Sequence, residues 1–344
     1  MSDHMARGPG GRPTLPAALL PALADHYGLQ DMEEVRDLGG STSLNLLVRC
    51  DAGASVVRVH RASLTTDRLA AMQEARRFIT QAGIPCAVPL RTRTDASWIT
   101  VGAYLVEVEP HVPSTDKMDT WDRLEAGLPL LGRIHRCMHH LDIGRAGRHA
   151  PASNSIPPGK LVQGVRAGIA RLRSWGPTAA EQELATMAET LALQVRVLEQ
   201  LNATFPLQLV HGDYWDNNVL FQNDTVVLVA DLDFMGARAR IDDLALTLYY
   251  TQSTFADDRT SDIRLRQLRG LVDAYERGLD APLAAEERRA IPLAMARTVL
   301  GFVAMIAHTE SDTVGRQLAA EMAPDLDWTQ ALLEDVPRWQ EAMA

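Results

Sequence analysis

The residues best suited to chemistry lie within and between two apolar runs in the second half of the chain. The first run, with a polar loop inside it, reads LVHGDYWDNNVLF over residues 209–221, and the second reads VVLVADLDF over residues 226–234. Two apolar runs joined by a short polar turn predict a β-hairpin. The polar loop and the end of the second run would then meet at one mouth of the hairpin. This mouth gathers carboxylates and amides, from Asp213, Asp216, Asn217, Asn218 and Asp231.

These side chains offer hard oxygen ligands, which suit Mg²⁺ and suit neither zinc nor copper. Phosphoryl transfer needs such groups, because two oxygen ligands hold a metal against the phosphates while one carboxylate orients the attacking hydroxyl and accepts its proton. Catalysis is then mainly positioning and charge neutralisation, so few residues suffice. A plain surface loop is the structural alternative, but such loops commonly hold only one or two acids. The segment therefore predicts a magnesium-dependent phosphotransferase site.

The elements that must position this site fall into two regimes. Between residues 35 and 112, short β-branched runs separated by turn residues predict an antiparallel sheet, interrupted by one helix over residues 66–82. Beyond this region helical periodicity dominates, broken by the hairpin region at residues 207–234. The sequence thus predicts an α+β, bilobal architecture, with a small antiparallel-sheet lobe and a large, mainly helical lobe. Ligands commonly bind where two such lobes meet.

Composition and charge narrow the class of protein. The 344 residues carry a formal net charge of −10 without a lysine cluster, which argues against a nucleic-acid partner. Three scattered cysteines exclude a disulfide framework and a cysteine zinc site, and fit a reducing compartment. The first residues lack the apolar core of a signal peptide, and the apolar stretch at 291–308, interrupted by Pro292 and Arg297, is predicted to be too short to span a bilayer. We expect a cytoplasmic monomer or homodimer with no membrane partner.

The spacing His211-x-Asp213-x-x-x-x-Asn218, followed by Asp231, resembles the catalytic loop and metal aspartate of the aminoglycoside phosphotransferase family. That family includes choline kinase-like and homoserine kinase-like enzymes and is related to the protein kinases. The resemblance covers nearly the whole chain, and its specific part is residues 211–245. It implies a protein-kinase-like fold in which Asp213 is the catalytic base, Asn218 and Asp231 bind Mg²⁺, and His211 organises the loop.

The resemblance also implies a division of labour between the lobes. Residues 1–18 are expected to form a disordered tail and residues 19–112 a nucleotide-binding lobe. Residues 113–344 would form the helical lobe, which carries the catalytic hairpin and the acceptor site. The cofactors would be Mg²⁺ and ATP, with GTP as the alternative nucleotide.

Two further acids near the loop need an assignment. Asp243 lies in IDDLA, a segment similar to the family's Asp-Leu-Ala helix start, where it would brace the catalytic loop; a plain helix N-cap is the alternative. Asp233 lies two residues beyond Asp231 and would face the same side of a strand. Either could reach the metal. The spacing of the family favours Asp231 and leaves Asp233 to assist or to contact substrate.

A phosphate grip in the N-terminal lobe also follows from the resemblance. Arg58 stands where the family has a lysine, and it keeps the positive charge and can bind phosphate through two N–H groups. Glu74 in the next helix would be its ion-pair partner. The linker backbone around Val108 would hydrogen-bond the nucleobase. The loop over the phosphates would supply N–H groups and hydroxyls from Gly39, Gly40, Ser41, Thr42 and Ser43.

The acceptor is expected to be a small alcohol rather than a protein. The segment between Asp231 and Asp243 is too short for the long activation segment that docks a peptide in protein kinases. Asp216 and Asp233, with Trp215, are candidate substrate contacts, and the two acids would favour an amino alcohol or an aminoglycoside. A neutral sugar, macrolide or nucleoside acceptor is the alternative, as is an inactive nucleotide-binding pseudokinase. A role in antibiotic resistance, biosynthesis or catabolism stays open.

Overall fold

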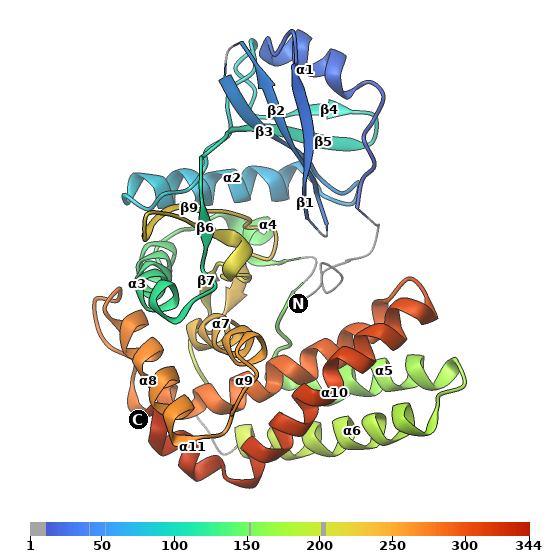
Figure 1. The fold of residues 1–344 in the computed structure, drawn as a ribbon, viewed down its shortest axis with the longest axis vertical. Coiled ribbons are helices and arrows are strands. Elements are labelled where there is room, and N and C mark those ends of the chain that lie inside the picture. The colour runs from blue at the N-terminus through green and yellow to red at the C-terminus, as the bar shows by residue number, and fades with distance from the viewer. Residues whose placement is uncertain (1–11, 41, 52, 151–152, 201–203) are drawn as a thin grey trace.

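The computed structural model describes residues 12–344 apart from 41, 52, 151–152 and 201–203, and it folds into two lobes (Figure 1). The N-terminal lobe contains a five-stranded antiparallel sheet in the order β1-β2-β3-β5-β4. Helix α1 packs on one face of the sheet, and α2 lies between the sheet and the second lobe (Figure 1). The elements of this lobe are α1 (Leu19–Tyr27), β1 (Glu34–Gly39), β2 (Leu44–Cys50), β3 (Gly53–Val59), α2 (Thr66–Gln81), β4 (Ile99–Val101) and β5 (Tyr104–Pro110).

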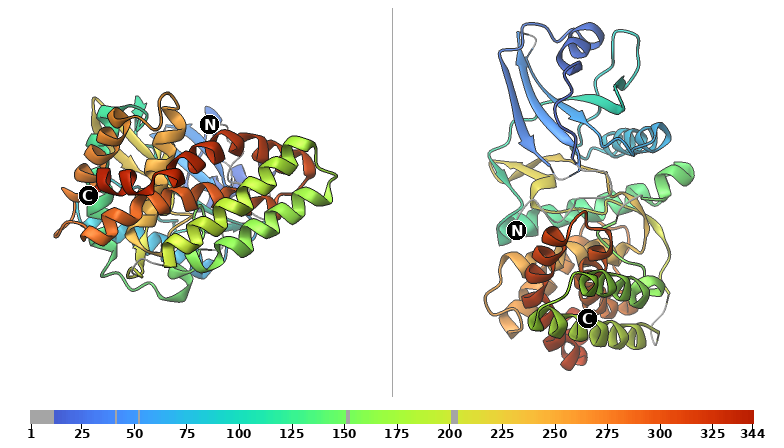
Figure 2. Two further views of the ribbon diagram at one scale, coloured as in Figure 1. Left: turned by 90° about the horizontal axis from the view of Figure 1, so that it is seen from below. Right: turned by 90° about the vertical axis from the view of Figure 1, so that its right-hand side faces the viewer.

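The C-terminal lobe is mainly helical, with short strands near the junction of the lobes (Figure 2). Strand β6 pairs with the hairpin β8–β9, and β7 pairs with β10. This α+β, two-lobed architecture confirms the predicted fold class. The elements are β6 (Asp116–Lys117), α3 (Trp121–Met138), α4 (Gly144–Arg148), α5 (Leu161–Ser174), α6 (Ala179–Gln200), β7 (Gln208–Val210), β8 (Val219–Gln222), β9 (Thr225–Val229), β10 (Gly236–Arg238), α7 (Arg240–Thr254), α8 (Asp262–Glu276), α9 (Ala285–Met305), α10 (Asp312–Glu334) and α11 (Val336–Met343).

The N-terminal sheet has two chemically different faces, because successive side chains of a strand point to opposite sides. Its outer face is apolar and packs against Leu19 and Leu23 of α1. Its inner face is polar: Arg58 is paired across the strands with Asn45 on one side and Glu107 on the other. Buried residues of the outer face include Leu44, Leu46, Val48, Val57, Val59, Val106 and Val108. The inner face therefore brings charged groups to the junction of the lobes.

Helix α2 spans the junction, and its start is fixed locally. The Thr65 hydroxyl accepts a hydrogen bond from Arg68 N at 3.3 Å, which satisfies one of the unpaired N–H groups at the helix start. Leu69, Met72 and Ile79 are buried at helical spacing, as the sequence predicts. The predicted helix is therefore confirmed.

Helix α9 is the most apolar helix of the C-terminal lobe. With the short 3₁₀ segment that follows it, Ala285–His308 is long and apolar enough to cross a membrane by length and composition alone. This corrects the expectation from the sequence, because Pro292 lies inside the helix without ending it. The most apolar 18-residue window of this segment is 83% buried inside the protein. Packing inside the core explains the composition.

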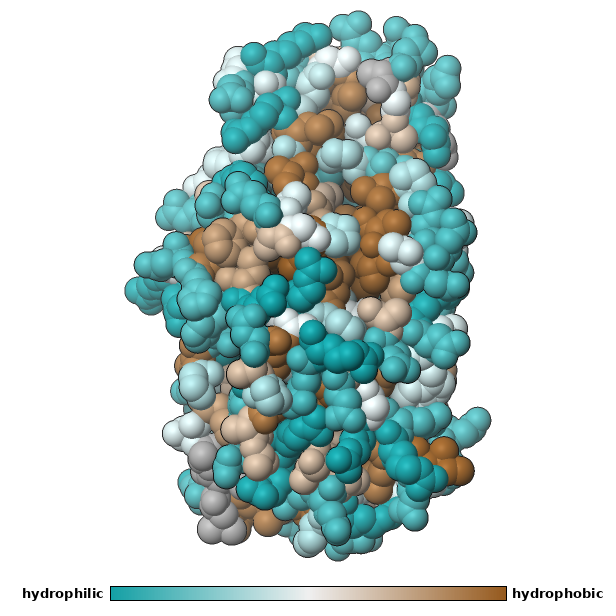
Figure 3. Space-filling view, turned by 90° about the vertical axis from the view of Figure 1, so that its left-hand side faces the viewer, coloured by the Kyte–Doolittle hydropathy of each residue, from teal (hydrophilic) through white to brown (hydrophobic). Residues whose placement is uncertain are grey.

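The described chain begins at Arg12, before α1. The segment before α1 lies beside the outer face of the sheet, and Arg12 donates to Asp37 Oδ2 at 2.9 Å. Residues 1–11 of the expected tail lie outside the described part, and the tail stays a prediction. In Figure 3 apolar side chains gather mainly in the upper middle of one face, near the junction of the lobes, and hydrophilic residues cover most of the rest.

Candidate active site

The catalytic loop lies between β7 and β8, directly before the predicted hairpin. Strands β8 and β9 form that hairpin, with Val219 opposite Val229. Asn218 closes a single 3₁₀ turn that leads into β8, and Asp231 follows β9. Asp231 has a positive φ of 61°, a conformation that non-glycine residues adopt rarely and that often marks a functional turn. The hairpin mouth thus brings Asp213, Asn218 and Asp231 together, as predicted.

The carboxylate of Asp213 is held by amide groups on both of its oxygens. Asn154 Nδ2 donates to Oδ1 at 2.7 Å, and Asn218 Nδ2 donates to Oδ2 at 2.9 Å and to the Asp213 carbonyl at 2.8 Å. Asn154 is buried and lies in the segment between α4 and α5. This segment has no chemical signature, so the sequence did not reveal Asn154. Two fixed donors leave the carboxylate in one orientation, which a base that must meet a hydroxyl requires.

The surroundings of Asp213 favour its protonated form. Burial and the nearby charge of Asp231 raise the pKa of Asp213 to about 8, against the lowering effect of the amides of Asn218 and Asn154. A catalytic base works best when its pKa lies near the working pH. Perturbed carboxyls of this kind are typical of functional sites.

Asp243 braces the loop through backbone N–H groups, as predicted. Its Oδ2 accepts from His211 N at 3.0 Å and its Oδ1 accepts from Gly212 N at 2.8 Å. His135 Nε2 lies 2.9 Å from the same Oδ2, and Tyr275 OH lies 2.7 Å from His135 Nδ1. Burial opposes ionisation, but the hydrogen bond and charge of His135 lower the pKa of Asp243. His135 therefore links Asp243 to Tyr275 inside the core.

His211 joins the catalytic loop to the segment after β9, next to Asp231. Its Nε2 donates to Ala230 O at 2.9 Å, and its Nδ1 accepts from Asp213 N at 3.2 Å. One ring nitrogen donates and the other accepts, so the imidazole is neutral. Burial lowers the pKa of His211, in agreement with that form. These hydrogen bonds hold the loop against the segment after β9, which agrees with the loop-organising position expected of His211.

Arg58 reaches from β3 across the junction to both acids of the second strand. Its Nη2 lies 2.8 Å from Asp231 Oδ1 and 3.1 Å from Asp233 Oδ2. Burial opposes ionisation of Asp233, but the charges of Arg58 and neighbouring basic residues lower its pKa to about 2. Arg58 therefore lies at the end of the hairpin, against both candidate metal-binding acids. Asp233 pairs with Arg58 and is buried, which fits an assisting role better than contact with substrate.

The glycine-rich loop also reaches Asp233. Thr42 Oγ1 and Ser43 Oγ each donate to Asp233 Oδ2 at 3.2 Å. Gly40 has a φ of 113°, which favours glycine, and an added Cβ would lie 2.8 Å from Ser43 O. Ser41 lies outside the described residues. The two hydroxyls and Arg58 thus present their donors to carboxylates at the place where phosphates would be held.

Glu74 does not pair with Arg58, so this prediction is wrong. Glu74 is exposed on α2 and bonds with Arg77 at 2.7 Å, one turn further along the same helix. The position before it, Gln73, faces the sheet instead and is buried. The error arises because helical spacing alone does not fix which of two neighbouring residues faces the sheet.

The buried acid of the N-terminal lobe is Glu107 on β5. Its Oε2 accepts from Arg76 Nη2 at 2.5 Å and from Gln73 Nε2 at 2.7 Å, and its Oε1 lies 3.1 Å from His60 Nε2. Glu109 also contacts Arg76. Here the helix supplies the cation and the sheet supplies the carboxylates, the reverse of the expected pair. Burial opposes ionisation, but Arg76 and His60 lower the pKa of Glu107.

Arg68 is a second functional candidate that the sequence did not reveal. Its Nη1 donates to Ala146 O at 3.1 Å and Gly147 O at 2.8 Å. Its Nη2 donates to Asp233 O at 3.0 Å and Met235 O at 2.5 Å. This buried guanidinium therefore ties α2 to α4 and to the segment after Asp231. A carbonyl cage of this kind has no signature in a sequence.

Three remaining predicted contacts differ from expectation. Val108 is fully buried on the outer face, and its carbonyl accepts from Leu90 N at 2.7 Å, so this position does not suit nucleobase binding. Trp215 is buried against Tyr250, with ring centroids 5.2 Å apart, and belongs to the core. Asp216 accepts from Lys117 Nζ at 2.6 Å, so its charge is already balanced.

The donor set at the hairpin mouth fits Mg²⁺. Asn218 uses its Nδ2 towards Asp213, which directs the amide oxygen elsewhere, and the hydrogen bonds of Asp231 within the described residues all use Oδ1. One amide oxygen and one carboxylate, completed by phosphates and water, are the usual protein contribution to a magnesium site. Among the described residues no group of three or more His, Cys, Asp or Glu could hold a metal alone.

Comparison with known proteins agrees with this geometry. Residues 33–289 match the model of the phosphotransferase enzyme family. An amicoumacin kinase solved with AMP-PNP and Ca²⁺ has a TM-score of 0.67 at 15% identity, and the match covers 92% of each chain. A microcompartment-associated aminopropanol kinase has a TM-score of 0.66 at 19% identity, covering 93% of this chain and 98% of the other. A spectinomycin phosphotransferase solved with ADP and spectinomycin has a TM-score of 0.65 at 11% identity, covering 94% and 99%. The match over three quarters of the sequence and the shared fold show that the chain belongs to the phosphotransferase enzyme family.

Proposed function

We propose that this protein is a magnesium-dependent kinase that transfers the γ-phosphate of ATP, or of GTP, to a hydroxyl of a small molecule. The observation that carries the proposal is Asp213, whose two oxygens are held by Asn154 and Asn218 beside the acid Asp231. A fixed carboxylate with a raised pKa, next to a hard-oxygen pair, suits proton acceptance from an alcohol.

Each residue of the site has a role in this mechanism. Asp213 orients the acceptor hydroxyl and receives its proton as the new O–P bond forms and the bond to the leaving nucleotide breaks. Arg58, which lies against Asp231 and Asp233, would direct its fork of donors to the phosphates. Asp231 and Asn218 would hold Mg²⁺, which supplies charge neutralisation at the phosphates. Asp243 and His211 keep the loop in place.

The acceptor is proposed to be an amino alcohol or a compound like an aminoglycoside. Support now comes from similar structures, whose names include an aminopropanol kinase and a spectinomycin phosphotransferase. The acids Asp216 and Asp233 do not strengthen this preference, because Lys117 and Arg58 already balance them. The amine, if present, would be recognised by other groups.

A coupled nucleotide-consumption assay with Mg²⁺ tests the proposal. The acceptor panel should contain aminoglycosides, 1-amino-2-propanol, homoserine, choline, macrolides, hexoses and nucleosides, each with and without EDTA. Turnover of one class that Asp213→Ala abolishes would support the kinase. Nucleotide binding without transfer to any member would favour the pseudokinase alternative, and no effect of ATP on the melting temperature would contradict both.

A further inference from the structure

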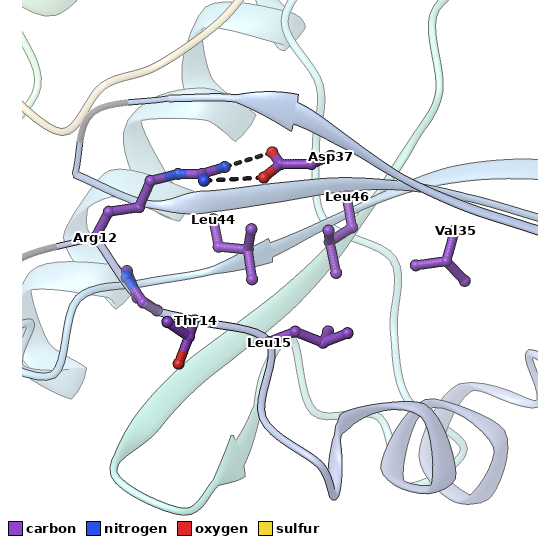
Figure 4. Close-up of a pocket in the computed structure, with 8 residues that line it drawn as sticks. Arg12, Thr14, Leu15, Val35, Asp37, Leu44 and Leu46 are labelled. Carbon is purple, nitrogen blue, oxygen red and sulfur yellow. Dashed lines mark hydrogen bonds and ion pairs between the residues drawn. The ribbon is translucent and has the colours of Figure 1, made fainter. Parts of the chain in front are cut away.

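The segment before α1 crosses the outer side of the glycine-rich loop and places one arginine on it. Arg12 donates from Nη1 to Asp37 Oδ2 at 2.9 Å, and its Nη2 contacts Asp37 Oδ1 (Figure 4). The same Nη2 donates to Gly39 O at 3.2 Å, and Nε donates to Ser43 O at 3.3 Å. One guanidinium therefore spans both arms of the turn between β1 and β2.

Asp37 is the centre of this contact. Its Oδ1 also accepts from Gly39 N at 2.8 Å, and Gly39 O accepts from Asn45 Nδ2 at 3.0 Å. The hydrogen bond and charge of Arg12 lower the pKa of Asp37, which keeps the carboxylate ionised. The register slips between Asp37 and Gly39, so the ladder alone does not fix this arm.

The contacts of Arg12 hold both arms of the loop from the outer side. Gly39 O accepts from Arg12 and also from Asn45 Nδ2, which belongs to the inner face. Ser43 O accepts from Arg12 Nε. On that inner side the hydroxyls of Thr42 and Ser43 reach Asp233. A loop held in this way presents donors where an anion would bind.

We propose that Arg12 is a positioning residue that pre-orders the glycine-rich loop for the phosphates of the nucleotide. This inference rests on the proposed function, because it assigns the loop to nucleotide binding. Arg12 does not touch the nucleotide; it acts through Asp37, Gly39 and Ser43. Preordering lowers the entropic cost of binding, so loss of Arg12 weakens nucleotide affinity while leaving acceptor affinity unchanged.

The contact contributes little to global stability, which makes the proposal separable from a structural role. The side chains of Arg12 and Asp37 are 28% and 48% exposed, and ion pairs of this exposure stabilise a fold weakly. Nearby, Pro13 is buried, and it lines a pocket together with Thr14, Leu15 and strand residues of the outer face (Figure 4). The melting temperature should therefore remain unchanged when nucleotide affinity falls.

The test is the dissociation constant of Mg·ATP, measured by calorimetry in the absence of acceptor. Arg12→Ala should weaken binding roughly tenfold, because the nucleotide must then order the loop itself. Arg12→Lys should restore only part of the affinity, since an ammonium lacks the fork that spans both arms. Arg91→Ala is the matched control, because Arg91 is an exposed arginine of the same lobe that faces an aspartate, Asp95, away from the loop.

Each outcome decides a different question. Equal affinity of wild type and Arg12→Ala would overturn the positioning role, as would an equal loss in Arg91→Ala. A fall in affinity accompanied by an equal rise in the KM of the acceptor would also overturn it, because that pattern indicates general damage. If wild type itself binds no nucleotide, the proposed function fails before the inference is reached.

Discussion

The two lobes hold their parts of the site in different ways. In the C-terminal lobe the catalytic loop is fixed by hydrogen bonds from its backbone to Asp243 and by hydrogen bonds from the amides of Asn154 and Asn218 to Asp213. In the N-terminal lobe the corresponding groups form a network of buried charges drawn from distant elements, with Glu107 at its centre. The comparison teaches that one half is organised by hydrogen bonds to backbone and amide groups and the other by pairing of buried charges.

The largest predicted effect is a loss of kcat when Asp231, in the C-terminal half of the site, is replaced. Asp231→Ala should lower kcat by about a thousandfold or more, because removing a metal-holding carboxylate leaves the developing charge unbalanced. Asp233→Ala should cost less if Asp231 is the main metal ligand, and Asp224→Ala, at an exposed position in the hairpin turn, should cost nothing. Steady-state kinetics with varied Mg²⁺ measure these differences. A greater loss in Asp233→Ala would exchange the roles of the two acids.

The next effect tests the N-terminal half through its buried acid. Glu107→Gln should lower the free energy of unfolding by about 2–4 kcal/mol, because it leaves Arg76 buried with less compensation. Glu74→Gln is the matched control and should change stability by less than about 0.5 kcal/mol, since Glu74 is exposed. Urea unfolding of both variants checks the difference. Equal effects would mean that the expected Glu74 pair, rather than the Glu107 network, organises this lobe.

A smaller effect links Asp213 to pH. The pKa of this carboxyl is about 8 in the folded protein and about 4 in the unfolded chain. The folded state therefore binds the proton more tightly, and its stability falls as the pH rises from about 4 to about 8. Asp213→Ala removes this term. The stability difference in favour of the variant should therefore grow by about 1–2 kcal/mol between pH 5 and pH 8, the full linkage being reduced because the residue is only half-buried. Urea unfolding in EDTA measures it, and a difference that shrinks with pH would contradict the raised pKa.

The smallest effect concerns acceptor choice. Asp216→Asn should leave the KM of an amine-bearing acceptor within about twofold, because Lys117 already balances the charge of Asp216. A selective loss of amine acceptors in this variant would restore Asp216 as a substrate contact.

The comparison also explains what the sequence could predict. The hairpin mouth follows from apolar runs and a local spacing, so Asp213, Asn218 and Asp231 could be placed together, while the bracing roles of His211 and Asp243 follow from the family resemblance. These residues lie close in sequence, and their geometry follows from one strand pair.

The residues that the sequence did not reveal were missed for a different physical reason. Asn154, Arg68 and Glu107 act through contacts between segments far apart in the chain, and an amide, an arginine and a strand glutamate have no signature outside the fold. Glu74 was chosen because a family pattern supplies a helix acid, whereas the sheet supplies the buried acid here. Asp216 and Trp215 have side chains that could bind a substrate. In the structure Asp216 is paired with Lys117, and Trp215 is packed in the core.

The measurement that tests the central claim most directly is phosphate transfer by wild type and Asp213→Ala in parallel. Transfer of labelled γ-phosphate to an acceptor identified in the panel should fall about 10³- to 10⁴-fold in the variant, since proton acceptance by a fixed base contributes effects of that order. The dissociation constant of Mg·ATP should stay near that of wild type. Near-normal transfer by Asp213→Ala would contradict the assignment of Asp213 as the base and the mechanism built on it.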